Sequence, residues 1–331
     1  MKIAINGFGR IGRIFLRRIL TRPGMEVVAI NDLTDTATLA HLFKYDSVHR
    51  GFAGDVSFDD RHLIVNNKKI KILAERDPAK LPWKALDIDL VIESTGKFTT
   101  RQGGEMHLAA GAKRVIISAP SADKDIPTVV LGVNDDTVDL SSNILSNASC
   151  TTNNVATMVK ILDDNWGIVD GYITTVHSMT GDQSLHDAPH KDLRRARAAS
   201  ASIIPTTTGA AKAITSIFPH LTGKLGGAGI RVPVLNGSLT DFTCILNQQP
   251  TVKEINLAFK QAAQGDMKNI LEYTEDPIVS ADIVGNTHSC VFDALLTSVV
   301  GDLTKVVGWY DNEMGYSSRL ADLVEKIHLL T

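Results

Sequence analysis

The chain has 331 residues, of which 44% are hydrophobic and 21% charged, and a formal net charge of -3. This is the composition of a folded globular protein, and the length favours two domains. The nearly balanced charge gives no electrostatic reason to expect nucleic acid as the main ligand. The first residues lead directly into a strand-like segment and no apolar run is long enough to span a bilayer, so we expect a cytoplasmic protein.

Over about the first 150 residues, short β-rich runs alternate with helical patterns, which predicts a parallel sheet with crossover helices. A further stretch, residues 55–76, has the pattern of a small antiparallel insertion. The other elements expected here, in chain order within each type, are strands at 2–6, 26–31, 89–94, 114–119 and 128–132 and helices at 11–22, 36–46 and 105–112.

The pattern changes near residue 149, where long strands begin to follow one another and predict an α+β domain with a mainly antiparallel sheet. We therefore expect a first domain at 1–149 and a catalytic domain at 150–314, with a C-terminal helix at 315–331 that packs back on the first domain. The elements expected in this half are strands at 171–179, 229–248, 289–301 and 303–312 and helices at 151–165, 209–218, 252–264 and 315–328.

A glycine pattern follows the first strand and opens the first helix, which is the context that a dinucleotide fingerprint requires. Gly7 would permit the tight turn, Gly9 the close approach of a pyrophosphate, and Gly12 the packing of helix on strand. Asp32 ends the second strand, where an acid holds the adenosine ribose and repels a 2′-phosphate. The pattern predicts NAD and a Rossmann-type doubly wound parallel sheet; the alternative is a plain βα turn with a solvated acid.

Cys150 lies after the small polar residues of SNAS and just before an amphipathic helix, with Ser149 as the expected N-cap. The positive end of a helix and its unpaired N–H groups lower the pKa of a thiol and can hold an oxyanion. A cysteine is more often a small core residue, and we interpret Cys244 and Cys290 in this way. Three scattered cysteines form neither a disulfide framework nor a zinc motif, and we expect no metal.

His177 is the expected partner of Cys150. A helix from residue 151 carries the chain about 22 Å away, and a strand that returns through 168–177 covers about 30 Å. His177 can therefore arrive beside the helix start and act as a general base. Without the cysteine, a structural histidine on a strand would be the preferred interpretation.

Several downstream residues can bind anions: Thr180, Asp182, the basic run 190–197, the segment 205–209 and Arg231. Thr208 and Gly209 open a predicted helix and offer a hydroxyl and main-chain N–H groups to a phosphate. Arg231 stands among apolar strand residues, where a guanidinium needs an anionic partner. The basic run is equally consistent with a solvated loop or a subunit contact, and the absence of interleaved aromatic residues argues against a nucleic-acid patch.

With these residues assembled, the whole chain resembles the glyceraldehyde-3-phosphate dehydrogenase family. The matching stretches, in family order, are INGFGRIGR, ASCTTN, TTVHS, HKDLRRARAA, IIPTTTGAAKA, RVP and WYDNEMGY. The resemblance implies a homotetramer in which the 181–205 segment reaches towards a neighbouring subunit's cofactor. It also implies oxidative phosphorylation of D-glyceraldehyde 3-phosphate to 1,3-bisphosphoglycerate with reduction of NAD, in glycolysis or gluconeogenesis.

The resemblance also implies residue roles. Cys150 would form a thiohemiacetal and then a thioester that inorganic phosphate cleaves, and His177 would take the hydroxyl proton. The remaining implied residues are Thr180, Asp182, Arg195 and Arg231 for the substrate phosphate; Ser149, Thr151, Thr208, Gly209 and Arg231 for the attacking phosphate; and Arg10, Ile11, Arg76, Thr95, Ser118 and Asn312 for the cofactor.

Two positions depart from the family pattern. Asn154 stands where many members carry a second cysteine, and Ala188 precedes Pro189 where many NAD-specific members have Leu or Gly, which weakens slightly the case against NADP. The closest rival is an erythrose-4-phosphate dehydrogenase, which hydrolyses the thioester and generally lacks the Thr-Gly helix start. A non-catalytic nucleotide- or RNA-binding protein is a further alternative that predicts affinity without turnover.

Overall fold

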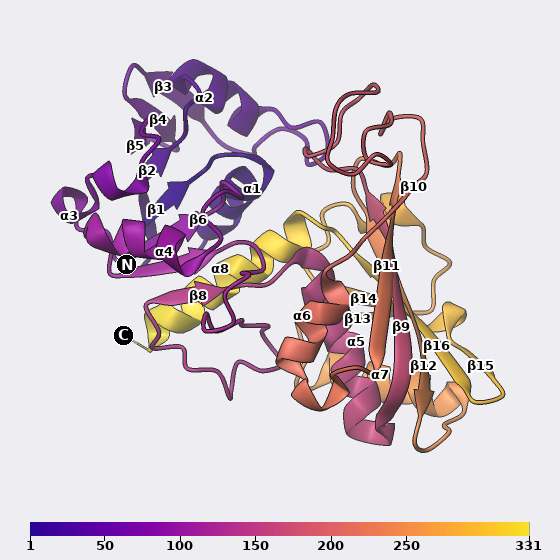
Figure 1. The fold of residues 1–331 in the computed structure, drawn as a ribbon. Helices are drawn as coiled ribbons and strands as arrows, with labels where there is room; N and C mark the ends of the chain where they lie inside the picture. The colour runs from indigo at the N-terminus through magenta and orange to yellow at the C-terminus, as the bar shows by residue number, and fades with distance from the viewer. Residues whose placement is uncertain (331) are drawn as a thin grey trace. The chain divides into compact units, whose positions relative to one another are not determined.

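A computed structural model describes residues 1–330, which form two compact units (Figure 1). The first unit comprises Met1–Val129, Asp135–Ala148 and the chain from Ser317 onwards. The second unit comprises Val130–Asn134 and Ser149–Tyr316. Each unit has its own sheet and its own helices.

The first unit is built on a sheet with the strand order β3-β4-β5-β2-β1-β6-β7-β8. The strand β1 pairs in parallel with β2 on one side and with β6 on the other, so the sheet is doubly wound as the sequence predicts. The bounds of its strands are β1 (Lys2–Asn6), β2 (Glu26–Asn31), β3 (Val56–Asp59), β4 (His62–Val65), β5 (Lys68–Leu73), β6 (Leu90–Glu93), β7 (Arg114–Ile117) and β8 (Ile144–Ser146).

The helices of the first unit include α8, most of which belongs to this unit. Arg22, just after α1, forms ion pairs with Asp322 and Glu325 of α8. Each of the longer crossover helices begins at a residue that sequence reasoning places within a few positions. The bounds are α1 (Arg10–Ile19), α2 (Thr36–Lys44), α3 (Trp83–Leu86), α4 (Arg101–Ala109) and α8 (Met314–Leu329), with a 3₁₀ turn η1 (Pro78–Lys80).

Two expectations for this sheet need correction. Residues 128–132 are not a strand: Thr128 makes an isolated bridge to Ser146, and the chain then turns, with the Asn134 side chain accepting from the N–H of Val130 at 2.8 Å. The apolar pattern there reflects a buried turn. The segment 55–76 is antiparallel as predicted, but β5 pairs in parallel with β2 and therefore extends the main sheet.

The second unit contains the sheet β10-β11-β9-β12-β16-β14-β13, with β15 paired to β16. Most of its pairs are antiparallel, as predicted, while β11 with β9 and β13 with β14 are parallel. The bounds are β9 (Ile168–Ser178), β10 (Ile204–Thr206), β11 (Leu225–Val232), β12 (Ser238–Leu246), β13 (Leu271–Thr274), β14 (Cys290–Asp293), β15 (Ser298–Val300) and β16 (Leu303–Tyr310).

Three longer helices accompany this sheet. The helix α5 packs against β9, β12, β14 and β16 (Figure 1). It carries a buried apolar stripe that includes Val155, Met158 and Leu162. The bounds are α5 (Cys150–Trp166), α6 (Ala210–Ile217) and α7 (Val252–Gln264), with 3₁₀ turns η2 (Pro219–Leu221), η3 (Ser280–Ile283) and η4 (Ala294–Leu296).

The predicted strand 229–248 is two strands, because the chain turns between β11 and β12. Pro233 cannot donate to a ladder, and Gly237 has a φ of +88°. A Cβ on Gly237 would lie 2.2 Å from the carbonyl oxygen of Ser280, so the turn requires glycine. Within residues 1–330 no helix combines the length and the apolar composition that crossing a membrane demands.

Candidate active site

A pocket of about 430 Å³ opens at the carboxyl ends of the strands of the first unit. Ligands of open α/β sheets bind at this edge, where the strand order reverses. Five of the predicted cofactor residues line it, and they are Gly7, Gly9, Asp32, Arg76 and Thr95. Its other lining residues, which the fingerprint alone did not reveal, are Asn6, Asn31, Leu33, Glu75, Ser94, Lys97 and Phe98.

The glycine loop packs so closely on its neighbours that Gly7 and Gly12 have no room for a side chain. Gly7 has a φ of +93°, and a Cβ there would lie 2.7 Å from the N of Thr95. A Cβ on Gly12 would lie 2.3 Å from the carbonyl oxygen of Gly7. At Gly9, by contrast, no atom of the described residues comes within 4 Å of the Cβ position, so a ligand can approach the backbone closely.

Asp32 is held by the loop that it faces. Its carboxylate accepts from the N–H of Phe8 at 2.8 Å and from the N–H of Thr34 at 3.0 Å. The side chain remains partly exposed, so a ribose hydroxyl can reach its oxygens. The acid therefore fixes the glycine loop and also presents negative charge to the pocket.

The start of α1 can bind a ligand through its main-chain N–H groups and not through its side chains. The Arg10 guanidinium pairs with Asp46 at 2.5 Å, and among residues 1–330 no side chain caps the first turn of α1. The N–H groups of Arg10 and Ile11 are therefore suited to a pyrophosphate. Ser118 follows β7, where its N–H donates to the carbonyl oxygen of Glu93 at 2.9 Å. The pocket, the glycine loop and the acid together fit a dinucleotide.

In the second unit, Cys150 is the first residue of α5. Ser149 caps the helix, since its Oγ accepts from the N–H of Thr152 at 3.0 Å. The sequence expectation of a capped helix beginning at this thiol agrees with the structure. Cys150 lies where the first-turn N–H groups point.

His177 reaches the thiol at the end of β9. Its Nε2 lies 3.5 Å from the Sγ of Cys150. The helix α5 runs away from Cys150, the chain reverses at Gly167 with a φ of +67°, and β9 returns beside α5. Chain geometry thus brings together the two residues that the sequence predicts as a pair.

The other side of the His177 ring faces a carbonyl and a cation. Its Nδ1 lies 2.7 Å from the carbonyl oxygen of Ser178, which can only accept, so we assign the ring proton to Nδ1 and the lone pair that faces the thiol to Nε2. Arg231, opposite His177 on β11, donates from Nη1 to the same carbonyl oxygen at 3.1 Å, and this Nη1 lies 2.6 Å from Nδ1. Burial and then Arg231 lower the pKa of His177 to about 4, so the imidazole is neutral at pH 7.

The expectation that the helix start lowers the pKa of the Cys150 thiol needs correction. Burial raises the pKa of Cys150, although Arg231 and the N–H groups of Thr151 and Cys150 oppose it. The helix start is present, but burial of the charged form outweighs it. A neutral His177 at 3.5 Å is therefore the group that can accept the thiol proton.

Three of the predicted substrate-phosphate residues lie together. Asp182 accepts from the Oγ1 of Thr180 and from the Nη1 of Arg195 at 3.0 Å. Burial raises the pKa of Asp182, but Thr180, Arg231 and Arg195 more than offset this and hold it below its usual range. An ionised carboxylate repels a phosphate, so Asp182 is suited to hold Arg195 and not to bind the anion itself.

The predicted attacking-phosphate residues are differently engaged. The hydroxyls of Thr151 and Tyr310 lie 2.8 Å apart, and Thr151 is buried. Thr208 accepts from the N–H of Ala210 at 3.2 Å, and Gly209 precedes the start of α6 without meeting any described atom at its Cβ position. The start of α6 is thus open to an anion, whereas the Thr151 hydroxyl is bound to Tyr310.

Asn312 has a fixed amide orientation. Its Oδ1 accepts from the Oγ of Ser178 at 2.8 Å and from the Oγ of Ser238 at 2.9 Å. The amide NH₂ is consequently the end that is left to donate to a ligand. The two serines are functional candidates that sequence reasoning missed, because nothing in their local pattern distinguishes them.

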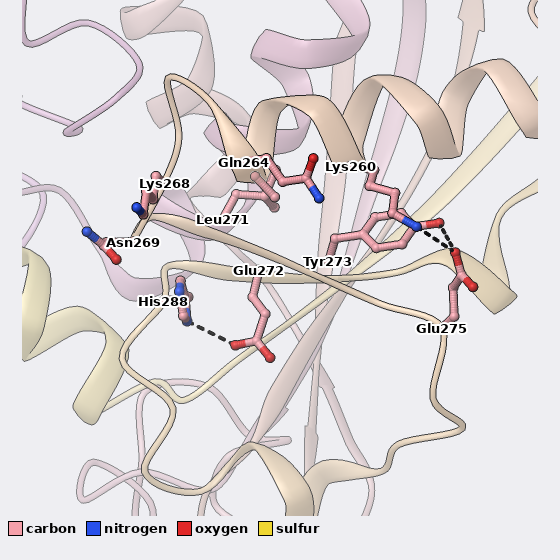
Figure 2. Close-up of a pocket in the computed structure, with 10 residues that line it drawn as sticks. Lys260, Gln264, Lys268, Asn269, Leu271, Glu272, Tyr273, Glu275 and His288 are labelled. Carbon is pink, nitrogen blue, oxygen red and sulfur yellow. Dashed lines mark hydrogen bonds and ion pairs between the residues drawn. The ribbon is translucent and has the colours of Figure 1, made fainter.

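A separate hollow of about 460 Å³ lies beside α7 and β13 (Figure 2). Two of its side chains face acids: Lys260 lies 3.6 Å from Glu275, and Nδ1 of His288 lies 3.0 Å from Glu272. Neither predicted catalytic residue lines it. We assign no ligand to this hollow.

Among residues 1–330 no group of three or more His, Cys, Asp or Glu side chains is placed to hold a metal ion. One unit has a doubly wound sheet with a dinucleotide pocket, and the other has a thiol–imidazole pair in contact with an arginine. These are the features of a cysteine-dependent dehydrogenase. Family models agree. Residues 1–101 match the NAD-binding domain of glyceraldehyde 3-phosphate dehydrogenase, and residues 149–312 match its C-terminal domain.

Full-length relatives give the same answer. The chain is 56% identical to the glyceraldehyde-3-phosphate dehydrogenase of Mycobacterium bovis, covering 98% of this chain and 97% of that one. It is 54% identical to glyceraldehyde-3-phosphate dehydrogenase 1 of Bacillus subtilis and to the enzyme of Geobacillus stearothermophilus, with 99% and 98% covered in each case. The chain belongs to the glyceraldehyde-3-phosphate dehydrogenase family, and its cofactor is NAD, as the sequence predicts.

Proposed function

We propose that the chain oxidises D-glyceraldehyde 3-phosphate and phosphorylates the product with inorganic phosphate, using Cys150 as nucleophile and His177 as acid–base partner. The 3.5 Å between Sγ and Nε2 at the start of α5 is the observation that carries the proposal. Residues 1–149 would form the NAD-binding domain, on which the C-terminal helix 315–331 packs, and residues 150–314 would form the catalytic domain. The matched ranges of the two family models support this division.

In this mechanism Cys150 loses its proton to Nε2 of His177 and attacks the aldehyde carbon. The first-turn N–H groups of α5 stabilise the oxygen of the thiohemiacetal. The protonated His177 returns its proton to this oxygen and forms the thiohemiacetal hydroxyl. The neutral His177 then takes the hydroxyl proton as hydride leaves the carbon and the thioester forms. NAD, when bound, supplies the hydride acceptor. Phosphate attacks the thioester carbon, and the Cys150 thiolate leaves.

Anion binding is divided between two groups of residues. Thr180, Arg195 and Arg231 would hold the substrate phosphate, with Asp182 orienting Arg195 through the 3.0 Å ion pair. Ser149, Thr208 and Gly209 would hold inorganic phosphate at the starts of α5 and α6, with Thr151 keeping Tyr310 in place. The remaining cofactor residues would be Gly7, Gly9, Arg10, Ile11, Gly12, Asp32, Arg76, Thr95, Ser118 and Asn312.

We further propose a cytoplasmic homotetramer. The segment 181–203 contains no helix or strand among the described residues and exposes apolar side chains in the single chain. Leu193 is 82% exposed and Ile203 is 70% exposed. Exposed apolar groups of this kind mark protein–protein contacts. The cytoplasmic location is inferred from the family's soluble substrate and cofactor.

The test is NADH formation from glyceraldehyde 3-phosphate and NAD, measured with and without phosphate, with erythrose 4-phosphate and NADP as alternative substrates. We expect turnover that requires phosphate. Robust turnover of erythrose 4-phosphate without phosphate would favour the hydrolytic relative, and binding of NAD without turnover would favour a non-catalytic role.

Cys150→Ser isolates the proposed nucleophile. The hydroxyl is too weakly acidic to replace the thiolate, so kcat should fall by about 10⁴-fold or more, while NAD binding measured by calorimetry stays close to wild type. Cys244→Ser is the matched control, because Cys244 is a buried strand residue remote in role from the reaction. Comparable loss of kcat in both variants would refute the assignment.

A further inference from the structure

Glu93 is a buried acid at the end of β6, directly behind the cofactor pocket. Its side chain is 1% exposed. One oxygen, Oε2, accepts from Nδ2 of Asn6 at 2.6 Å and lies 3.1 Å from Nε2 of His107. The other, Oε1, accepts from the N–H of Thr95 at 2.8 Å and from the Thr95 hydroxyl. The carboxylate thus joins three separate segments of the first unit.

All of these contacts are donors to Glu93. The indole N–H of Trp83 lies 3.0 Å from Nδ1 of His107, and an indole can only donate. Nδ1 of His107 is therefore the acceptor, and Nε2 carries the proton that points at Glu93. Both oxygens of Glu93 receive hydrogen bonds, so a carboxylate satisfies the site. A glutamine amide does not, because its NH₂ group would face hydrogen-bond donors in either orientation of the amide.

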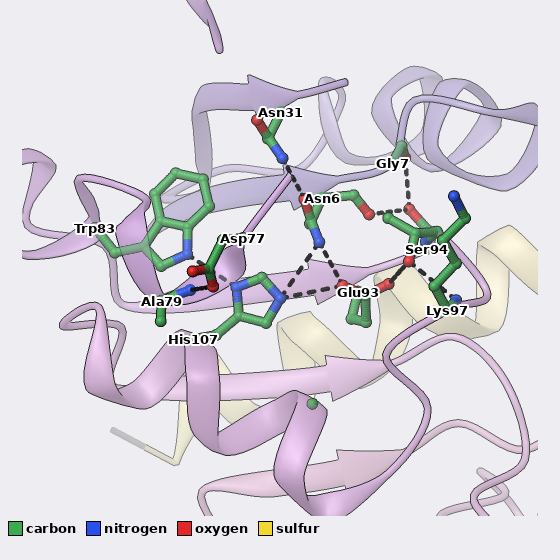
Figure 3. A network of polar contacts seen from close by, with 12 residues as sticks. Asn6, Gly7, Asn31, Asp77, Ala79, Trp83, Glu93, Ser94, Lys97 and His107 are labelled. Carbon is green, nitrogen blue, oxygen red and sulfur yellow. Dashed lines mark hydrogen bonds and ion pairs between the residues drawn. The ribbon is translucent and has the colours of Figure 1, made fainter. Parts of the chain in front are cut away.

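The contacts continue from Glu93 along the floor of the pocket. Asn31 donates to the Oδ1 of Asn6 at 2.7 Å and to the carbonyl oxygen of Glu75 at 2.9 Å. The chain of amides therefore crosses the ends of β6, β1 and β2 in their order in the sheet (Figure 3). Asn6, Asn31 and Glu75 all line the pocket, whereas Glu93 lies behind them.

Through Thr95, Glu93 also contacts the turn that faces the glycine loop. The turn at Ser94 and Thr95 packs closely on Gly7, because a Cβ added to Gly7 would lie 2.7 Å from the N of Thr95. The Ser94 hydroxyl donates to the carbonyl oxygen of Gly7 at 2.7 Å. A displaced Thr95 would therefore displace the first glycine of the loop.

We propose that Glu93 is a positioning residue for NAD: its carboxylate holds the Thr95 turn and the Asn6–Asn31 amides in the arrangement that binds the cofactor. It does not touch the reacting atoms, so it should act on cofactor affinity and leave the chemical step unchanged. The inference deepens the proposed cofactor site and rests on it.

The test is Glu93→Gln, with the Kd for NAD measured by calorimetry and kcat measured at saturating NAD. Two donors would lose their acceptor, so we expect the Kd to rise about tenfold or more while kcat stays within about twofold. Hydrogen exchange without NAD should be faster at residues 94–98 and unchanged in the strands β1 and β2. Glu93→Asp, which keeps the charge but withdraws it from its donors, should also weaken NAD binding.

Asp293→Asn is the matched control. Asp293 is a buried acid of the second unit that accepts from the indole N–H of Trp309 at 3.0 Å and from the N–H of Leu295 at 3.1 Å. The Asp293→Asn variant should have a lower melting temperature than the wild type and the same Kd for NAD. If Glu93→Gln and Glu93→Asp both lower the melting temperature but bind NAD like wild type, Glu93 is only structural and the proposal is overturned.

A further variant separates this proposal from the cofactor site itself. Asp32→Ala should weaken NAD binding if the pocket has been assigned correctly. Unchanged affinity in both Asp32→Ala and Glu93→Gln would overturn the pocket assignment. Weaker binding in Asp32→Ala alone would overturn only the role of Glu93.

Discussion

His177 and Arg231 lie opposite each other on neighbouring strands, so the charge of the arginine acts directly on the proton equilibrium of the thiol and the imidazole. Arg231 is partly buried, and a charge in such surroundings is screened less than one in open solvent. It disfavours an imidazolium and so helps burial to lower the pKa of His177, and it favours a thiolate and so opposes the burial that raises the pKa of Cys150. The proposed anion-binding residue therefore also influences the nucleophile.

Arg231→Gln tests this influence. Removing the positive charge destabilises the thiolate, so the pKa of Cys150 should rise, and the midpoint of the pH dependence of alkylation by iodoacetamide, a neutral reagent, should move up by about one pH unit. Arg197→Gln is the control, since Arg197 is exposed and pairs with Asp187 at 2.9 Å. A midpoint that stays in place or moves down would contradict the assignment.

At the scale of elements, the start of α5 combines stability with chemistry. Ser149 caps the helix on which Cys150 stands, while α7 begins with a capping box between Thr251 and Glu254. Both caps satisfy first-turn N–H groups and contribute similar stability. Only the first is next to the proposed nucleophile, so the two helices offer a way to separate folding from function.

Ser149→Ala and Thr251→Ala should each lower the free energy of unfolding by about 1 kcal/mol, measured by chemical denaturation. Ser149→Ala should in addition lower kcat, because the start of α5 would hold both the thiol and the attacking phosphate less well. Equal kcat in the two variants would show that the Ser149 hydroxyl contributes only to stability.

Elements also show where sequence reasoning succeeds and fails. The order of α5 and β9, with a reversal at Gly167, was enough to predict that His177 meets Cys150. The apolar residues 128–132 were wrongly predicted as a strand, because a buried turn and a buried strand have the same composition. The short strand β8 was missed, since Ile144–Ser146 is too short to show a period.

At the scale of the whole molecule, the tetramer proposal concerns apolar surface that one chain leaves exposed. Light scattering should give a mass four times the 35.8 kDa of a single chain. Leu193→Asp places a charge on the most exposed apolar residue of the 181–203 segment and should shift the mass downward at low protein concentration, whereas Leu329→Asp, exposed at the end of α8, should not. A monomeric wild type would contradict the proposal.

The sequence by itself determined the family, the doubly wound sheet, NAD as cofactor and the meeting of Cys150 with His177. These features depend on local spacing, on the helix and strand periods, and on a rare order of motifs. Tertiary structure alone decided the rest. Burial decides that the pKa of the Cys150 thiol is raised. Hydrogen bonds from Ser178 and Ser238 decide which end of the Asn312 amide can donate to a ligand. The hydrogen bonds of Glu93 come from Asn6 and His107, which are far from it in sequence. Such contacts join segments that share no local pattern, and only the folded chain brings them within hydrogen-bond distance.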